Sequence, residues 1–90
     1  MSRCVIVAMG FASGDICNHE GQYLKEFDFD SDGGRGRGEF TKDKMNAKIF
    51  SDPGSALRFW KSQSKVRPLR DDGEPNRPLS CLNIGIEHVE

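Results

Sequence analysis

Residues 79–89 read Leu-Ser-Cys-Leu-Asn-Ile-Gly-Ile-Glu-His-Val, and apolar side chains recur there at every second position. One side of an extended chain would carry Leu82, Ile84, Ile86 and His88. A period of two is typical of a β-strand with one face buried and the other in water. This segment therefore predicts a half-buried strand, the clearest one in the chain.

Three earlier segments can join it in a sheet. Residues 4–9 form a β-branched run that ends at Gly10, and residues 22–29 alternate with Tyr23, Phe27 and Phe29 on one side. Residues 30–38 are rich in Gly, Asp and Arg, which favours a loop, and residues 39–41 can return as a third strand. We expect these two strands to form a hairpin.

One helix is predicted to begin at Asp52-Pro53, because Asp caps helices and Pro is tolerated at the first helical position. Ala56, Phe59 and Trp60 follow at helical spacing and can cover a sheet, with Leu57 extending the same stripe. This spacing makes Trp60 a core residue rather than a base-stacking one. The helix should end at residues 62–64.

Residues 66–78 contain three prolines and an Asp72-Gly73 turn, so we expect an extended and largely unpaired loop before the last strand. The order is then β-β-β-α-β. The sequence predicts an α+β fold, as a single domain over residues 1–90: a small antiparallel sheet of three to four strands with one main helix packed on one face.

The composition favours a cytoplasmic protein. Three cysteines are an odd number and are widely spaced, so no disulfide framework is indicated. Residues 4–9 are too short to span a membrane or to act as a secretory core. We expect no membrane partner.

The net charge of −1 conceals a separation along the chain. Residues 35–70 hold ten basic and three acidic residues, whereas the remainder holds three basic and eleven acidic ones. Such a basic middle can attract an acidic partner. The alternative is an ordinary solvated surface on which the charges mix after folding.

The basic middle supplies the candidate partner-binding residues: Arg35, Arg37, Arg58, Lys61, Lys65, Arg67 and Arg70. The last five form a row along the predicted helix and the loop after it, which could follow phosphates or carboxylates. Aromatic residues interleaved with this row are missing, which weakens the case for free single-strand binding and favours a protein or ribonucleoprotein partner.

A calcium loop is an alternative for the hairpin tip, since Asp28, Asp30, Asp32 and Glu39 have the spacing D-x-D-x-D-G-x5-E. Arginines inside the loop lower its affinity for a cation. A flexible hairpin tip with no metal is the favoured interpretation.

Catalytic and cofactor motifs are not evident. Cys17 and His19 provide one short pair, whereas a zinc site needs four ligands and a nucleophilic pair needs an orienting partner. Gly34, Gly36 and Gly38, which alternate with Arg35 and Arg37, lack the strand-to-helix context and the lysine of a phosphate loop. The Arg-Gly tract gives only a weak RNA-binding signal. We expect no enzyme activity, no metal and no cofactor.

The segment Arg67-Pro-Leu-Arg-Asp-Asp-Gly-Glu-Pro-Asn-Arg-Pro-Leu79, with Ala47, Phe50, Ala56-Leu57, Trp60 and Gln63-Ser64 before it, resembles a family of small proteins of proteobacterial phages and prophages. The resemblance covers roughly the C-terminal half, with Tyr23 and the 32–36 region as weaker support. It implies a mobile-element origin and transfers no activity to individual residues.

Small, charge-polarised phage proteins without catalytic motifs are similar in general character to anti-CRISPR proteins, which dock on a Cas protein or a crRNA-bound complex and block target DNA. The resulting expectation is a phage-encoded binding protein that inhibits a host nucleoprotein complex. The alternatives are a phage accessory protein that binds nucleic acid directly, through phosphate-backbone contacts, and a calcium-binding loop protein.

Overall fold

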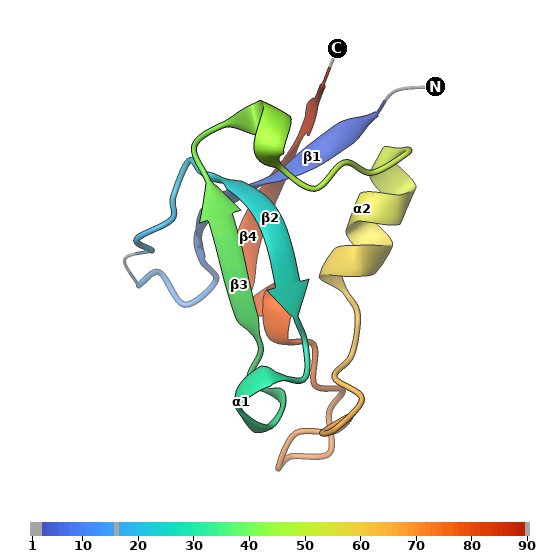
Figure 1. Cartoon of the computed structure of the whole chain (residues 1–90). Coiled ribbons are helices and arrows are strands. Elements are labelled where there is room, and N and C mark those ends of the chain that lie inside the picture. Colours follow the sequence, from blue (N-terminus) through green and yellow to red (C-terminus); the bar gives the residue numbers. More distant parts are fainter. Residues whose placement is uncertain (1–2, 16, 90) are drawn as a thin grey trace.

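The computed structural model describes residues 3–15 and 17–89. Its strands are β1 (Cys4–Phe11), β2 (Tyr23–Asp28), β3 (Arg37–Thr41) and β4 (Leu82–His88). Its helices are α1 (Ser31–Gly34), α2 (Pro53–Trp60) and the 3-10 turns η1 (Lys44–Asn46) and η2 (Pro78–Cys81). The strands form one antiparallel sheet in the order β3-β2-β1-β4, with α2 beside it (Figure 1). The expected α+β fold is confirmed.

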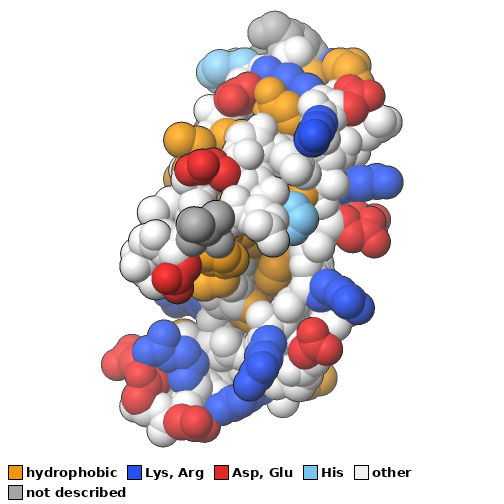
Figure 2. Space-filling view, turned by 90° about the vertical axis from the view of Figure 1, so that its left-hand side faces the viewer, with side chains coloured by type: hydrophobic (Ala, Val, Ile, Leu, Met, Phe, Trp, Pro, Cys, Tyr) orange, Lys and Arg blue, Asp and Glu red, His pale blue; other side chains and the backbone are white. Residues whose placement is uncertain are grey.

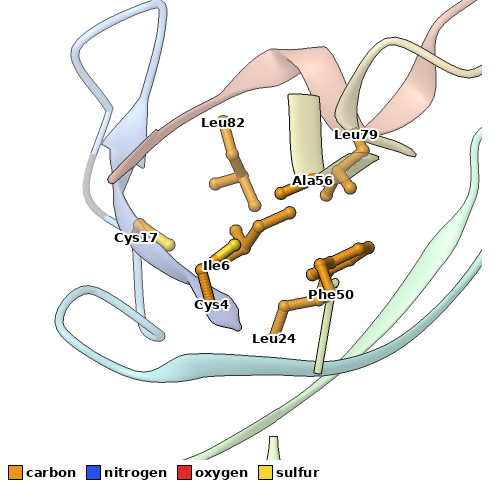
Figure 3. Close-up of a cluster of buried hydrophobic side chains, with 8 residues drawn as sticks. All are labelled: Cys4, Ile6, Cys17, Leu24, Phe50, Ala56, Leu79 and Leu82. Carbon is orange, nitrogen blue, oxygen red and sulfur yellow. The ribbon is translucent and has the colours of Figure 1, made fainter. Parts of the chain in front are cut away.

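The core lies between the sheet and α2. β4 pairs along the whole of β1, from Cys4 opposite His88 to Phe11 opposite Leu82. Leu82 is buried and Ile84 and Ile86 pack against the same cluster, so the alternation of the last strand is confirmed. The buried cluster in Figure 3 consists of Cys4, Ile6, Cys17, Leu24, Phe50, Ala56, Leu79 and Leu82.

β2 departs from the predicted alternation because it contains a bulge. Leu24 pairs with Phe40 and Glu26 pairs with Glu39, which leaves one extra residue on β2. A bulge moves the residues after it to the opposite face. Leu24 and Phe27 therefore both contribute to the core. The prediction that Tyr23 shares a face with Phe27 is wrong.

Tyr23 instead contacts β4, since its hydroxyl donates to Oε1 of Glu87 at 3.2 Å. Lys44 approaches the same carboxylate at 3.3 Å. Tyr23 pairs with Val7 and Glu87 pairs with Val5, so this polar cluster lies on the sheet face that carries Val5 and Val7.

β1 and β2 are paired only near Val7 and Tyr23, and beyond this point they separate. The backbone of Phe50 pairs with Cys4 through bonds of 3.0 and 2.8 Å, and Lys48 N–H donates to the carbonyl of Leu24 at 2.9 Å. Residues 48–50 thus hold both strands where they diverge. The β2–β3 hairpin extends away from this point towards α1, at the lower end of Figure 1.

α2 begins where the sequence predicts, but it ends at Trp60, before the predicted end at residues 62–64, because Ser62 N–H donates to the Phe59 carbonyl at 3.2 Å and so leaves the α-helical pattern. Asp52 caps it by accepting from Ser55 N–H at 2.7 Å, and Ala56 is fully buried. Trp60 belongs to the core, where its indole N–H donates to the Leu82 carbonyl at 3.0 Å. Leu57 was expected in the same stripe, but it is 41% exposed and does not pack against the buried cluster.

Candidate functional site: the arginine-lined end

Two segments that are distant in sequence meet at the lower end of the molecule in Figure 1. Oδ1 of Asp30, on the hairpin tip, accepts from Ser64 Oγ at 3.0 Å, Lys65 N–H at 2.6 Å and Val66 N–H at 3.2 Å. Ser64 is 1% exposed. Hydrogen bonds from the Lys65 backbone first, then from Ser64 and Val66, lower the pKa of Asp30. This carboxylate joins the tip to the segment after α2.

Asn76 makes a second connection between these segments. Its side-chain Nδ2 donates to the backbone carbonyls of Gly34 at 2.7 Å and Arg67 at 2.9 Å. Its backbone carbonyl accepts from Ser64 N–H at 3.0 Å. Gly34 is buried in this contact, and a Cβ there would lie 2.6 Å from Cβ of Arg67. The hairpin tip is therefore packed and hydrogen-bonded, rather than a free loop.

The segment after α2 is also more ordered than predicted. Leu69 and Pro75 form an antiparallel bridge, Arg70 N–H donates to the Glu74 carbonyl at 2.7 Å, and Asn76 N–H donates to the Pro68 carbonyl at 2.8 Å. Proline lacks a donor but keeps its carbonyl as an acceptor, so the prolines do not prevent pairing. The predicted turn at Asp72-Gly73 is confirmed. The prediction of a largely unpaired loop over residues 66–78 is wrong.

Three of the predicted partner-binding residues come together here. Arg35 from the hairpin and Arg67 and Arg70 from the later segment line a surface hollow of about 370 Å³. We call it the arginine hollow. The rest of its lining is Gly34, Asp71, Asp72 and Asn76.

Two of these arginines are paired with acids that follow the basic middle of the sequence. Arg67 forms an ion pair with Asp71, and Arg70 forms one with Asp72 at 2.6 Å. The Arg70 hydrogen bond lowers the pKa of Asp72, and the Asp72 carboxylate raises the pKa of Arg70. The charge separation along the sequence is therefore partly cancelled in the fold. Within residues 3–15 and 17–89, the exposed Arg35 side chain has no ion-pair partner.

The other predicted residues lie outside the hollow. Arg37 lines a separate groove of about 480 Å³ with Lys48, Phe59 and several acids. Arg58 donates to Ser55 Oγ at 2.9 Å on the exposed face of α2. Lys61, at the C-cap of α2, and Lys65 are exposed. The structure thus divides the predicted row into distinct parts.

Three of the four acidic residues of the alternative calcium loop have other contacts. Asp30 faces residues 64–66, Asp28 accepts from Asp30 N–H at 3.0 Å, and Glu39 pairs with Glu26 in the sheet. In the part of the chain that is described, no three His, Cys, Asp or Glu side chains are grouped to hold a metal ion. The geometry gives the calcium alternative no support.

A second hollow shares Arg35 with the first and was not found from the sequence. We call it the aromatic pocket; its volume is about 230 Å³. It is lined by Phe11, Cys17, His19, Phe27, Arg35, Gly36, Gly38, Phe40, Pro78, Cys81 and Leu82. Figure 2 shows a face of the molecule that is hollowed near its middle, with hydrophobic side chains inside the hollow and a histidine beside it.

Comparison of the chain with protein-family models, with curated proteins and with solved structures finds no match. Among the described residues, no helix is long and apolar enough to cross a membrane.

Proposed function

We propose that this protein binds a nucleoprotein by placing the arginine hollow against phosphates of its nucleic-acid component, and that it inhibits the complex by occupying that surface. The observation that carries the proposal is the convergence of Arg35, Arg67 and Arg70 from two distant segments. Arginine suits such a surface because its planar guanidinium can bind phosphate through two parallel hydrogen bonds.

The surface is ordered before any partner arrives. Asp30 and Asn76 fasten the backbone on both sides of the hollow, so little conformational entropy is lost when a partner binds. The ion pairs of Arg67 and Arg70 do not block phosphate, because exposed pairs of this kind contribute only about 0–1 kcal/mol. Asp71 and Asp72 can yield to a stronger anion.

The particular partner we propose is a crRNA-bound Cas complex of a bacterial host, with binding rather than catalysis as the mechanism of inhibition. The support is the resemblance of residues 47–79 to small phage proteins, together with a pre-ordered cationic surface. Cys17 and His19 do not favour a catalytic alternative, since Cys17 is buried and His19 stacks on Phe40.

Plaque formation by a CRISPR-targeted phage, on a host that expresses the protein, tests this proposal. The wild type should restore plaques, and the double variant Arg35→Glu/Arg70→Glu should not, because both charges at the hollow are reversed. The control is Lys25→Glu/Lys42→Glu, which makes the same change in net charge at two exposed lysines outside the hollow.

The control variant should act like the wild type. If the wild type does not restore plaques, the Cas complex is not the partner. If the Arg35→Glu/Arg70→Glu variant restores them fully, the arginine hollow is not the binding surface.

A further inference from the structure

The aromatic pocket has the size and lining of a site for one ring. Its volume of about 230 Å³ is smaller than the 300–1,000 Å³ typical of pockets for drug-sized ligands. Phe11, Phe27 and Phe40 are half-buried in its lining. Within the described part of the chain, none of its lining residues carries a carboxylate. A single flat, apolar or weakly polar group therefore fits this site.

One wall offers a stacking surface. His19 is exposed and lies flat on Phe40, with ring centroids 4.5 Å apart and an angle of 14° between the planes. A stacked pair of this kind presents a broad π-face to solvent. Histidine and phenylalanine are among the side chains on which unpaired bases stack.

Glycines on β3 and just before it let the aromatic rings approach the backbone. A Cβ on Gly36 would lie 2.5 Å from Cζ of Phe27 and 2.8 Å from Cβ of Pro78. A Cβ on Gly38 would lie 2.8 Å from Cε1 of Phe40. The glycines therefore shape the pocket, and Arg35, the residue before Gly36, is also part of its lining.

Arg35 also lines the arginine hollow, so the two sites lie next to each other at this residue. A ring in the pocket would lie next to Arg35, which has no ion-pair partner in the described part of the chain, and Arg67 and Arg70 line the same hollow as Arg35. An apolar site for a ring beside a group of cations matches a nucleotide chain, in which a base is attached through its sugar to a phosphate. A hydrophobic side chain of a protein would fill the pocket but would not explain the arginines next to it.

We propose that the aromatic pocket holds one unpaired nucleobase of a single-stranded nucleic acid, whose phosphates continue past Arg35 into the arginine hollow. The inference rests on the proposed function, because it names the part of the nucleoprotein that is bound. It also supplies aromatic residues next to the basic ones, which the sequence had appeared to lack.

Cys81 provides a direct readout. It is the exposed cysteine of the pocket lining, whereas Cys4 and Cys17 are buried. The rate at which N-ethylmaleimide alkylates Cys81 in the wild-type protein should be measured with a short single-stranded oligonucleotide and with an abasic oligonucleotide of the same length. Occupied by a base, the pocket should protect Cys81 in proportion to the bound fraction. The abasic chain should bind through its phosphates without protecting it.

The exposed His19 allows a second measurement with little risk to folding. His19→Ala should weaken binding of the base-containing oligonucleotide by about 5- to 150-fold, which corresponds to the 1–3 kcal/mol of one base–aromatic stack, and should not affect the abasic chain.

The outcomes separate the two proposals. Binding of both oligonucleotides without protection of Cys81 would overturn the base site and leave the arginine surface standing. Equal protection by both would also overturn it, because the base would then be irrelevant. If neither oligonucleotide binds, the nucleobase proposal is wrong, and a pocket for a side chain of a protein partner becomes the better explanation.

Discussion

Asp30 is the residue on which the arginine-lined end depends most. One carboxylate oxygen accepts hydrogen bonds from a side-chain hydroxyl and two backbone N–H groups of residues 64–66. The spacing of the acids is the only local signal at Asp30, and it indicates a calcium ligand as the alternative. The donors that it binds are more than thirty positions away, and no local pattern identifies them.

The pH dependence of stability in the Asp30→Asn variant should show how much the Asp30 carboxylate contributes. Its pKa is lowered in the folded state, so its contribution to stability is present above the unfolded value of about 3.9 and is lost as pH falls through the folded pKa. We expect Asp30→Asn to have a lower Tm than the wild type near neutral pH, and the gap to narrow below about pH 4.

Thermal denaturation followed by circular dichroism at a series of pH values measures this gap. Asp15→Asn is the control, because Asp15 is exposed and its contacts are local ones with Ser13. A gap of constant size at all pH values would contradict the structural importance of the Asp30 charge.

Asp71 and Asp72 should moderate the affinity of the hollow for anions. Each is paired with an arginine that we assign to phosphate binding. Asp71→Asn and Asp72→Asn should each tighten binding of a short single-stranded oligonucleotide, by up to about fivefold, since an exposed ion pair is worth at most about 1 kcal/mol. Fluorescence anisotropy measures the change. Weaker binding by both variants would show that these carboxylates orient the arginines rather than compete for them.

At the scale of the element, the Gly-Arg repeat of β3 and the turn before it has two functions. Its glycines allow close packing, and its arginines line the surface. Gly34, Gly36 and Gly38 lie against other side chains, whereas Arg35 and Arg37 are exposed and line different hollows. The two arginines of the repeat therefore do not act on one surface, since only Arg35 lines the arginine hollow.

Gly36→Ala tests the packing of this element. Gly36 has φ +84°, and its Cβ would overlap Phe27 and Pro78, so we expect a loss of roughly 2–4 kcal/mol in the free energy of unfolding. Gly73→Ala is a matched control, because Gly73 has the same φ of +84° with no atom within 4 Å of the added Cβ. It should cost only the backbone strain of about 1 kcal/mol.

Urea denaturation of the two variants supplies both values. Equal losses would mean that the close contact at Gly36 adds nothing, and the tight packing of the aromatic pocket would be contradicted.

Elements with local signals could be predicted from the sequence. β4 alternates over its whole length and α2 begins with Asp52-Pro53, so periodicity and capping identify both. The face assignment of β2 could not be predicted, because the bulge next to Glu26 depends on its register with β3. The backbone hydrogen bonds within residues 66–78 were not predicted, because the three prolines indicated an unpaired loop. Proline lacks a backbone donor, but its carbonyl can still accept.

The candidate site was predicted only in part. Arg35, Arg67 and Arg70 were among the expected residues, but their separation from Arg37 and Arg58 depends on tertiary structure. The aromatic pocket draws its lining from residues between Phe11 and Leu82, so no single stretch of sequence contains it.

For the whole molecule, the sheet and α2 provide a core from which the β2–β3 hairpin and residues 64–76 extend to one end (Figure 1). Both hollows that we assign to the partner adjoin this end and share Arg35. The central claim is that this end binds phosphates of a single-stranded nucleic acid.

The salt dependence of oligonucleotide binding tests this claim most directly. Affinity should fall linearly on a double-logarithmic plot, with a slope near −2 for three phosphate contacts on a single strand. Arg35→Ala should weaken binding and make the slope shallower by about 0.7, whereas Lys25→Ala should change neither. Identical affinities and slopes for the wild type, Arg35→Ala and Lys25→Ala would contradict the account.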